Sequence, residues 1–72
     1  MPNTIHTNEY KKIIDHLKQA RVGAGLTQKD VANKLKKSQS YISKVEAGEQ
    51  RVDILEMKKF AELYKKPINY FL

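Results

Sequence analysis

Cysteine is absent from this 72-residue chain, and glycine and proline are scarce, with three and two residues respectively. Without cysteine, neither a disulfide nor a zinc–thiolate site can supplement the core, and the composition suits a reducing compartment. The scarcity of glycine and proline leaves no stretch that resembles a flexible linker or a low-complexity tail. A chain this short forms one domain at most, and we expect its stability to be marginal.

Long apolar runs are also missing. No stretch approaches the roughly 20 apolar residues of a membrane span, and the sequence Met-Pro-Asn-Thr-Ile-His at the start is too polar for a signal peptide. We find no internal repeat. Caps and turns divide the chain into segments that are too short for a basic amphipathic helix lying on a membrane. These features favour a cytoplasmic protein.

Basic residues outnumber acidic ones. Fourteen lysines and arginines stand against eight carboxylates, which gives a formal net charge of +6 and a pI of about 9.7. The middle of the chain is slightly more basic than its ends. A polyanion is the natural partner for such a chain, although charge alone also fits a small domain that is basic for solubility.

Hydrophobic spacing and capping residues predict an all-α fold, a compact bundle of five short helices. The first helix is expected to start near residues 7–9 and to end near Val22, before Gly-Ala-Gly. Thr27 and Asp30 match a capping box for a second helix, and Lys36-Lys37 forms the turn that follows it.

Further caps delimit the remaining helices. Ser38 is the N-cap expected for the third helix, and Gly48 fits a left-handed closing position. Asp53 with Glu56 predicts a second capping box, and Pro67 suits the first turn of a short last helix. The apolar positions expected to pack inside are Ile13, Ile14, Leu17, Ala20, Val31, Ala32, Leu35, Ile42, Val45, Ile54, Met57, Phe60, Ala61, Tyr64, Ile68 and Phe71.

Three segments carry a resemblance to a known family. They are Leu-Thr-Gln-Lys-Asp-Val-Ala at 26–32, Ser-Gln-Ser-Tyr-Ile-Ser-Lys-Val-Glu-Ala-Gly at 38–48, and Ile-Leu-Glu-Met-Lys-Lys-Phe-Ala at 54–61. Over about residues 13–71 the chain resembles lambda-repressor-like, Cro/C1-type helix-turn-helix proteins, also called the XRE family. The resemblance implies a sequence-specific DNA-binding regulator of bacterial or phage origin, typically a repressor, found on the nucleoid when bound.

The resemblance also suggests a division of the chain. Residues 1–8 are interpreted as an N-terminal extension, and residues 9–72 as the DNA-binding domain with its helix-turn-helix at 27–47. The helix at 38–47 is expected to lie in the major groove. Because a single small domain makes few base contacts, we expect a homodimer on a two-fold symmetric operator.

Four polar residues of the third helix are candidates for base contacts: Gln39, Ser40, Ser43 and Lys44. In the family, the positions matching Gln39, Ser40 and Lys44 reach base edges. Glutamine can pair with adenine through two hydrogen bonds, and lysine can donate to guanine. Serine can donate or accept, so it discriminates poorly, and Ser43 could touch either a base or a backbone oxygen.

Five residues are candidates for contacts with the DNA backbone: Gln28, Lys36, Lys37, Tyr41 and Arg51. Resemblance to the family implies that Gln28 and nearby N–H groups hold a phosphate, which fits the charge of a helix N-terminus. Lys36 and Lys37 depart from the family's usual glycine and apolar residue, but their ammonium groups attract phosphates. Tyr41 could contact a phosphate or a thymine methyl, or lie across the edge of the core. Arg51 could meet a phosphate or remain solvated.

Other residues point to structure and assembly. In related proteins an arginine ending the first helix meets a glutamate ending the third, so Arg21 and Glu46 are expected to form a structural salt bridge. Tyr70 and Leu72 are candidates for a dimer interface. The alternative function is a protein-interaction module, such as an antitoxin or adaptor, that binds a partner through the C-terminal helices.

An enzymatic function finds little support in the sequence. His6 and His16 are ten residues apart, without cysteines or clustered carboxylates at ligand spacing. No glycine-rich phosphate loop, nucleophile elbow or metal motif occurs. We therefore expect no catalytic residue, no metal and no cofactor.

Overall fold

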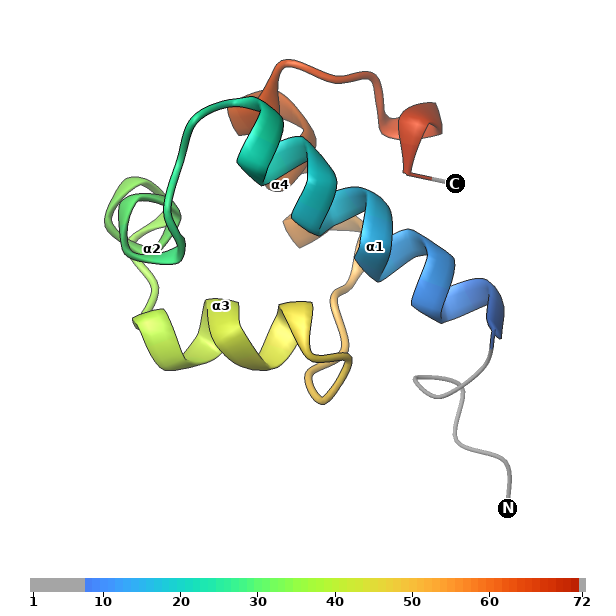
Figure 1. Ribbon diagram of the computed structural model, residues 1–72, viewed down its shortest axis with the longest axis horizontal. Helices are drawn as coiled ribbons and strands as arrows, with labels where there is room; N and C mark the ends of the chain where they lie inside the picture. Colours follow the sequence, from blue (N-terminus) through green and yellow to red (C-terminus); the bar gives the residue numbers. More distant parts are fainter. Residues whose placement is uncertain (1–7, 72) are drawn as a thin grey trace.

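The computed structural model describes residues 8–71. Four α-helices and one 3-10 turn follow one another along this part of the chain, without any strand (Figure 1). They are α1 (Asn8–Gly23), α2 (Gln28–Leu35), α3 (Gln39–Glu46), α4 (Ile54–Tyr64) and η2 (Ile68–Tyr70). The predicted all-α class is confirmed. Thr7, His6 and Leu72, which figured in the predictions, lie outside the described residues.

The predicted fifth helix is a single 3-10 turn rather than an α-helix. Pro67 precedes it in an extended conformation. Tyr70 N–H donates to the Pro67 carbonyl at 2.9 Å, and Phe71 N–H donates to the Ile68 carbonyl at 3.1 Å. These bonds span three residues, which is the pattern of a 3-10 helix. The turn places Phe71, whose side chain is fully buried, against the helices.

Side-chain caps begin three of the helices. Thr27 Oγ1 accepts from Asp30 N–H at 3.0 Å, and Asp30 Oδ2 accepts from Thr27 N–H at 2.9 Å, which confirms the capping box of α2. The hydrogen bond from the Thr27 backbone lowers the pKa of Asp30. Ser38 caps α3 in the same way, by accepting from Tyr41 N–H at 3.0 Å.

The second predicted box is only half present. Asp53 Oδ1 accepts from Glu56 N–H at 2.9 Å and so caps α4. The Glu56 carboxylate instead forms ion pairs with Lys37, at 2.9 Å, and with Lys59, at 3.6 Å. Two nearby ammonium groups compete with one backbone N–H for this carboxylate, and a charged donor forms the stronger hydrogen bond.

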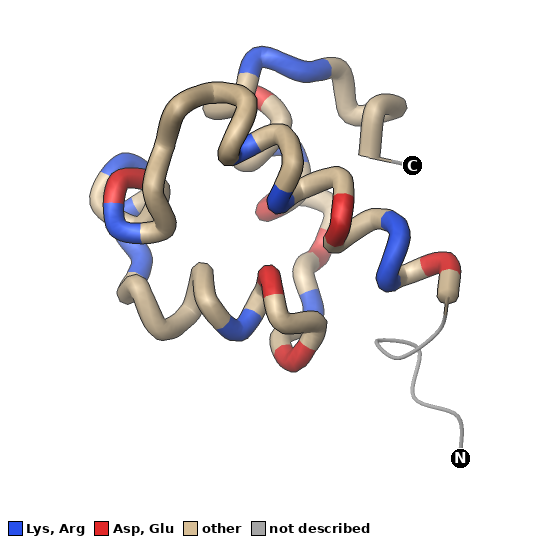
Figure 2. Tube along the Cα trace, viewed as in Figure 1, with Lys and Arg blue, Asp and Glu red and all other residues tan. Residues whose placement is uncertain are grey.

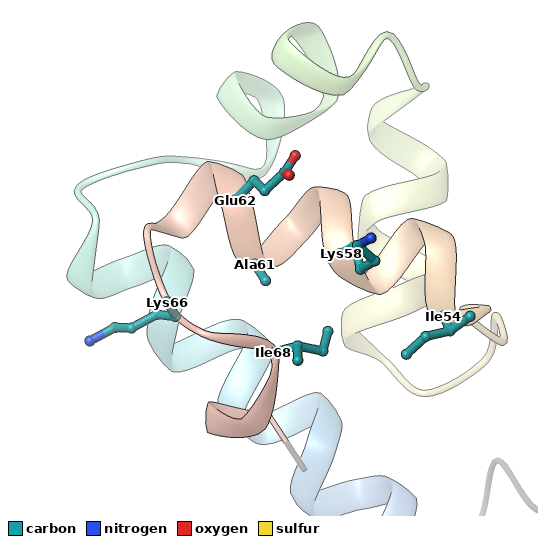
Figure 3. Close-up of a pocket in the computed structure, with 6 residues that line it drawn as sticks. All are labelled: Ile54, Lys58, Ala61, Glu62, Lys66 and Ile68. Carbon is teal, nitrogen blue, oxygen red and sulfur yellow. The ribbon is translucent and has the colours of Figure 1, made fainter.

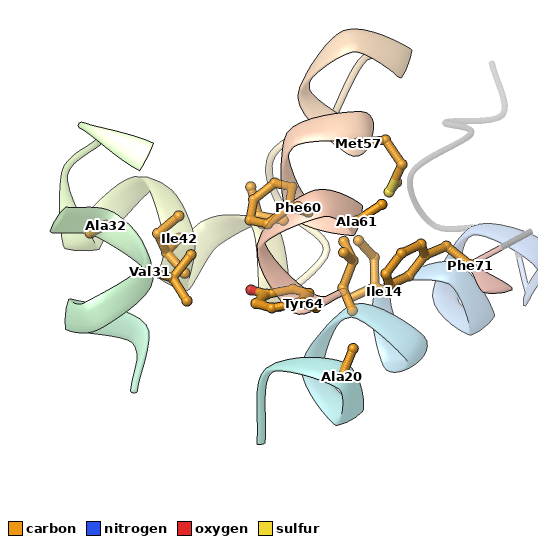
Figure 4. Close-up of a cluster of buried hydrophobic side chains, with 12 residues drawn as sticks. Ile14, Ala20, Val31, Ala32, Ile42, Met57, Phe60, Ala61, Tyr64 and Phe71 are labelled. Carbon is orange, nitrogen blue, oxygen red and sulfur yellow. The ribbon is translucent and has the colours of Figure 1, made fainter. Parts of the chain in front are cut away.

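One hydrophobic core joins all the elements, and Figure 4 shows its side chains converging from α1, α2, α3 and α4. Its buried members are Ile14, Leu17, Ala20, Val31, Ala32, Ile42, Val45, Met57, Phe60, Ala61, Tyr64 and Phe71. Of the other positions expected inside, Ile13, Leu35 and Ile68 are partly buried. Ile54 was placed in the core wrongly: it is 59% exposed, because it borders an open groove beside α4. Between residues 8 and 71, no helix has the length and apolar character that crossing a membrane requires.

Candidate nucleic-acid interface

The packing of α2 against α3 decides which face of α3 is free. Val31 and Ala32 of α2 and Ile42 and Val45 of α3 are all buried in the shared core. Since α3 makes one turn every 3.6 residues, burial of positions 42 and 45 leaves positions 40, 43 and 44 on the opposite side, with position 39 at the border of that side. The helix therefore presents one continuous polar face to solvent.

This outer face consists of the four residues predicted to contact bases. Gln39, Ser40, Ser43 and Lys44 are all exposed, and within residues 8–71 no hydrogen bond or ion pair is found for their side chains. Figure 2 shows basic residues at the turn before α3 and on α3 itself. The face carries donors, acceptors and one positive charge without an acidic residue, so its hydrogen-bonding groups are available to an external polyanion.

A partly buried ion pair fixes α3 to α1. Arg21 Nε and Nη2 donate to Glu46 Oε2 and Oε1 at 2.7 and 3.1 Å, and the two side chains are only 13% and 5% exposed. Arg21 Nη1 also donates to the Leu26 carbonyl at 2.8 Å. The hydrogen bond to Glu46 raises the pKa of Arg21. The structure thus brings together the two residues that the sequence paired, in the two-pronged geometry that favours arginine over lysine.

Gln28 joins the same network. Its Nε2 donates to Glu46 Oε1 at 3.1 Å, and the residue is half-buried at the start of α2. Glu46 therefore ties together residues from α1 and α2 at the C-terminal end of α3. The network fixes the orientation of the Gln28 amide. The sequence had suggested Gln28 as a phosphate ligand and gave no sign of this contact with Glu46.

The turn between α2 and α3 adopts the left-handed conformation that favours glycine. Lys36 has φ of 57°, its N–H points back to carbonyls of α2, and Lys37 N–H donates to the Ala32 carbonyl at 2.9 Å. This is the pattern of a Schellman motif, usually built with glycine. Lys36 thus occupies, with some backbone strain, the left-handed position that the family usually gives to glycine.

Replacing Lys36 by glycine should therefore stabilise the fold by about 0.5–1 kcal/mol, because glycine has no Cβ to clash in this conformation. Lys65, with φ of 59° after α4, should behave in the same way. Thermal unfolding measures both effects as a rise of several degrees in Tm. Lys58→Gly, inside α4, is the control and should lower stability by about 1 kcal/mol. Equal losses in all three variants would show that strain at Lys36 and Lys65 is negligible.

Lys37 and Tyr41 make contacts within the protein. The Lys37 ammonium forms an ion pair with Glu56 and lies 5.2 Å from the centre of the Tyr41 ring. Hydrogen bonding to Glu56 raises the pKa of Lys37, and burial raises the pKa of Tyr41. Tyr41 is half-buried and packs against the core edge, one of the two positions that the sequence left open for it.

The remaining predicted contacts are dispersed. Arg51 is exposed in the loop between α3 and α4. Tyr70 is half-buried: its ring lies 5.5 Å from His16 and 5.1 Å from Phe71, and the Lys66 ammonium lies 5.0 Å from its centre. Leu72, the other candidate for a dimer interface, lies outside the described residues.

Sequence reasoning missed Tyr10, which positions the loop between α3 and α4. Its hydroxyl accepts from Val52 N–H at 3.2 Å and lies 3.4 Å from the Gln50 carbonyl, to which it donates. The spacing of Tyr10 from Ile13 and Ile14 places it on the inward face of α1, which is a signal that could have revealed it. Through this hydroxyl, α1 holds two points of the loop between α3 and α4, at Gln50 and Val52.

An exposed apolar patch on α4 was also missed. Ile54 and Leu55 are 59% and 66% exposed. Beside them runs an open groove of about 320 Å³, bordered by Ile54, Lys58, Ala61, Glu62, Lys66 and Ile68. Figure 3 shows the side chains of Ile54, Ala61 and Ile68 turned toward the space between α4 and the segment after it. We call Leu55 and these groove residues the α4 patch.

The comparisons with known proteins agree with this geometry. A family model described as helix-turn-helix matches residues 17–71, which include α2, α3 and α4 in full. No curated protein gives a significant match. No group of histidine, cysteine or carboxylate side chains in the described part of the chain is suited to hold a metal ion. The family match spans most of the sequence and covers the exposed polar face of α3, so the chain belongs to the Cro/C1-type helix-turn-helix (XRE) family of DNA-binding proteins.

Proposed function

We propose that the protein is a sequence-specific transcriptional regulator that reads the major groove of double-stranded DNA with α3. The observation that carries this proposal is the outer face of α3, where four polar side chains are exposed without partners in the described structure. The Arg21–Glu46 pair holds this face in a fixed orientation. A polar face on a rigidly held helix is what direct readout of base edges requires.

The side chains of this face have different capacities. Gln39 can form two hydrogen bonds with adenine, and Lys44 can donate to the acceptors of guanine. Ser40 and Ser43, one turn apart on the same face, can each donate or accept. Gln39 and Lys44 therefore carry most of the proposed base preference, while the serines adjust the fit.

Contacts with phosphates would set the register of the protein on the duplex. The N-terminal end of α2 offers the backbone N–H groups near Gln28, whose side chain is already oriented by Glu46. Tyr41, half-buried on α3, and Arg51, exposed in the loop after α3, are the other candidates for phosphate contacts near this face. A regulator bound in this way represses by occupying its site, which requires no contact with a further protein.

We also propose that the protein acts as a homodimer through the α4 patch. In a two-fold interface, the same surface must complement itself. Lys58, Glu62 and Lys66 all border the groove, so an antiparallel second copy whose two-fold axis passes between Lys58 and Glu62 would set each Glu62 beside Lys58 of the other chain. Tyr70 is a weaker candidate than the sequence suggested, because its ring already packs against His16 and Phe71.

Selection of bound duplexes from a random pool tests the function directly. At about 150 mM salt, nonspecific attraction to phosphates is weakened, so base preference dominates recovery. We expect a palindrome whose half-sites lie about 10 bp apart, or a multiple of that spacing. A pool that remains featureless, with weak binding that salt abolishes, would contradict sequence-specific recognition.

Alanine at Gln39 or Lys44 should then relax the preference at one base pair of each half-site. The expected loss on the selected operator is about 1–3 kcal/mol, because one good side-chain-to-base pairing is removed. Binding to the operator and to single-base variants should be measured side by side. Lys18→Ala, which removes an exposed lysine of α1, is the matched control and should leave the preference intact. Uniform weakening on every duplex would exclude a base-reading role for the mutated residue.

A further inference from the structure

Two turns of this protein share both a sequence and a structure. In each, two lysines are followed by a tyrosine: Lys36, Lys37 and Tyr41 after α2, and Lys65, Lys66 and Tyr70 after α4. The first lysine is left-handed in both turns, with φ of 57° and 59°. The second lysine lies over the tyrosine ring in both, at 5.2 and 5.0 Å. This short repeat lies at helix ends rather than in a repeated helical unit, so it escapes a search for repeated helical units.

The two turns differ in one ion pair. The Lys37 ammonium lies 2.9 Å from the Glu56 carboxylate, whereas Lys66 has no ion pair with a carboxylate among the residues described. The turn after α4 closes with the same backbone conformation and the same cation–π contact. Glu56 is therefore not needed to form such a turn. The ion pair with Glu56 instead fixes the position of the Lys37 ammonium and balances its charge.

Glu56 changes what Lys37 can offer to DNA. A lysine strengthens DNA binding when its ammonium neutralises a phosphate and releases a condensed counterion. The Lys37 ammonium already faces a carboxylate that is only 18% exposed. To reach a phosphate, Lys37 would have to leave both Glu56 and the Tyr41 ring, and the Glu56 charge would remain close to the DNA backbone. Both lysines are exposed, but Lys36, in contrast to Lys37, has no ion pair in the described structure.

We propose that Glu56 holds Lys37 as a positioning residue, which fastens the turn to α4, and that Lys36 is the lysine of this turn that contacts a phosphate. The inference rests on the proposed function and refines it, because the sequence alone assigned both lysines to the DNA backbone. Glu56 thus takes the place that a phosphate would otherwise occupy at Lys37.

Salt dependence of binding to a random-sequence duplex separates the two lysines. Methionine is the substitution of choice, because it removes the charge and keeps a long apolar stem over Tyr41. In Lys36→Met, the slope of log affinity against log salt should fall in magnitude by about 0.9 per chain, as expected for one lost phosphate contact. In Lys37→Met the slope should stay unchanged. Lys18→Met, which removes an exposed lysine of α1, is the matched control and should also leave it unchanged.

Glu56→Gln tests the proposal from the other side. Freed from its carboxylate, Lys37 should gain a phosphate contact and raise the slope by up to about 0.9 per chain, an effect that a purely structural role of the pair would not produce. Thermal unfolding should establish that each variant is folded. Equal losses of slope in Lys36→Met and Lys37→Met, or an unchanged slope in Glu56→Gln, would overturn the proposal. A wild-type chain that binds no duplex would instead refute the proposed function itself, together with the role of Lys36.

Discussion

Replacing Glu46 by alanine should lower the free energy of unfolding by about 3–5 kcal/mol, which is the typical cost of leaving a buried charge without its partner. Arg21 is 13% exposed and would keep one neutral acceptor, the Leu26 carbonyl. Gln28 would lose its acceptor as well. A domain of this size has little stability in reserve, so the variant should be largely unfolded at 37 °C. Urea unfolding monitored by circular dichroism measures the loss.

Two further variants test whether the loss arises from the unpaired charge. Lys59→Ala removes the outer partner of a pair in which Lys59 is 59% exposed, and it should cost less than about 1 kcal/mol. Replacing Arg21 and Glu46 together by methionine removes both charges and should recover much of the stability lost in Glu46→Ala. A double variant as unstable as the single one would show instead that packing, rather than the unpaired charge, causes the loss.

Local chemistry explains which features of the fold could be predicted. Thr27, Ser38 and Asp53 each cap a helix through a bond to a backbone N–H only three residues away, so the sequence alone contains the whole interaction. The buried stripe of α3, Ile42 and Val45, follows in the same way from helical spacing. The resemblance to the family supplied the pairing of Arg21 with Glu46, which are 25 residues apart.

Contacts between distant segments escaped prediction where nothing local or familial marked them. The ion pair between Lys37 and Glu56 depends on how the turn after α2 meets the first turn of α4. In the sequence, Lys37 was already assigned to the DNA backbone and Glu56 to the capping box with Asp53. Ile54 fits the apolar period of α4, yet the neighbouring segment leaves it uncovered. Periodicity identifies the inward face of a helix, but it does not tell how far along that face the neighbouring elements reach.

A glutamate in place of Leu55 should convert the proposed dimer into a monomer. Leu55 is 66% exposed in the single chain, so the substitution should leave the fold intact. In the proposed dimer, the new carboxylate would be buried without a partner at a cost of about 3 kcal/mol or more, on the order of a 100-fold loss in the dimerisation constant. Sedimentation or light scattering measures the mass, and binding to the selected palindrome should fall in parallel because only one half-site is held.

The added negative charge would itself weaken binding to DNA, so the control must carry the same change elsewhere. Val22→Glu meets this requirement, since Val22 is a similarly exposed apolar residue, 62% accessible, on α1 rather than α4. It should retain the mass of a dimer and lose only the affinity that one charge accounts for. If both variants remain dimeric, the two-fold interface does not include Leu55. If the wild-type chain is a monomer that shows no base preference, the α4 patch is more consistent with docking of a different protein, as in the antitoxin or adaptor alternative.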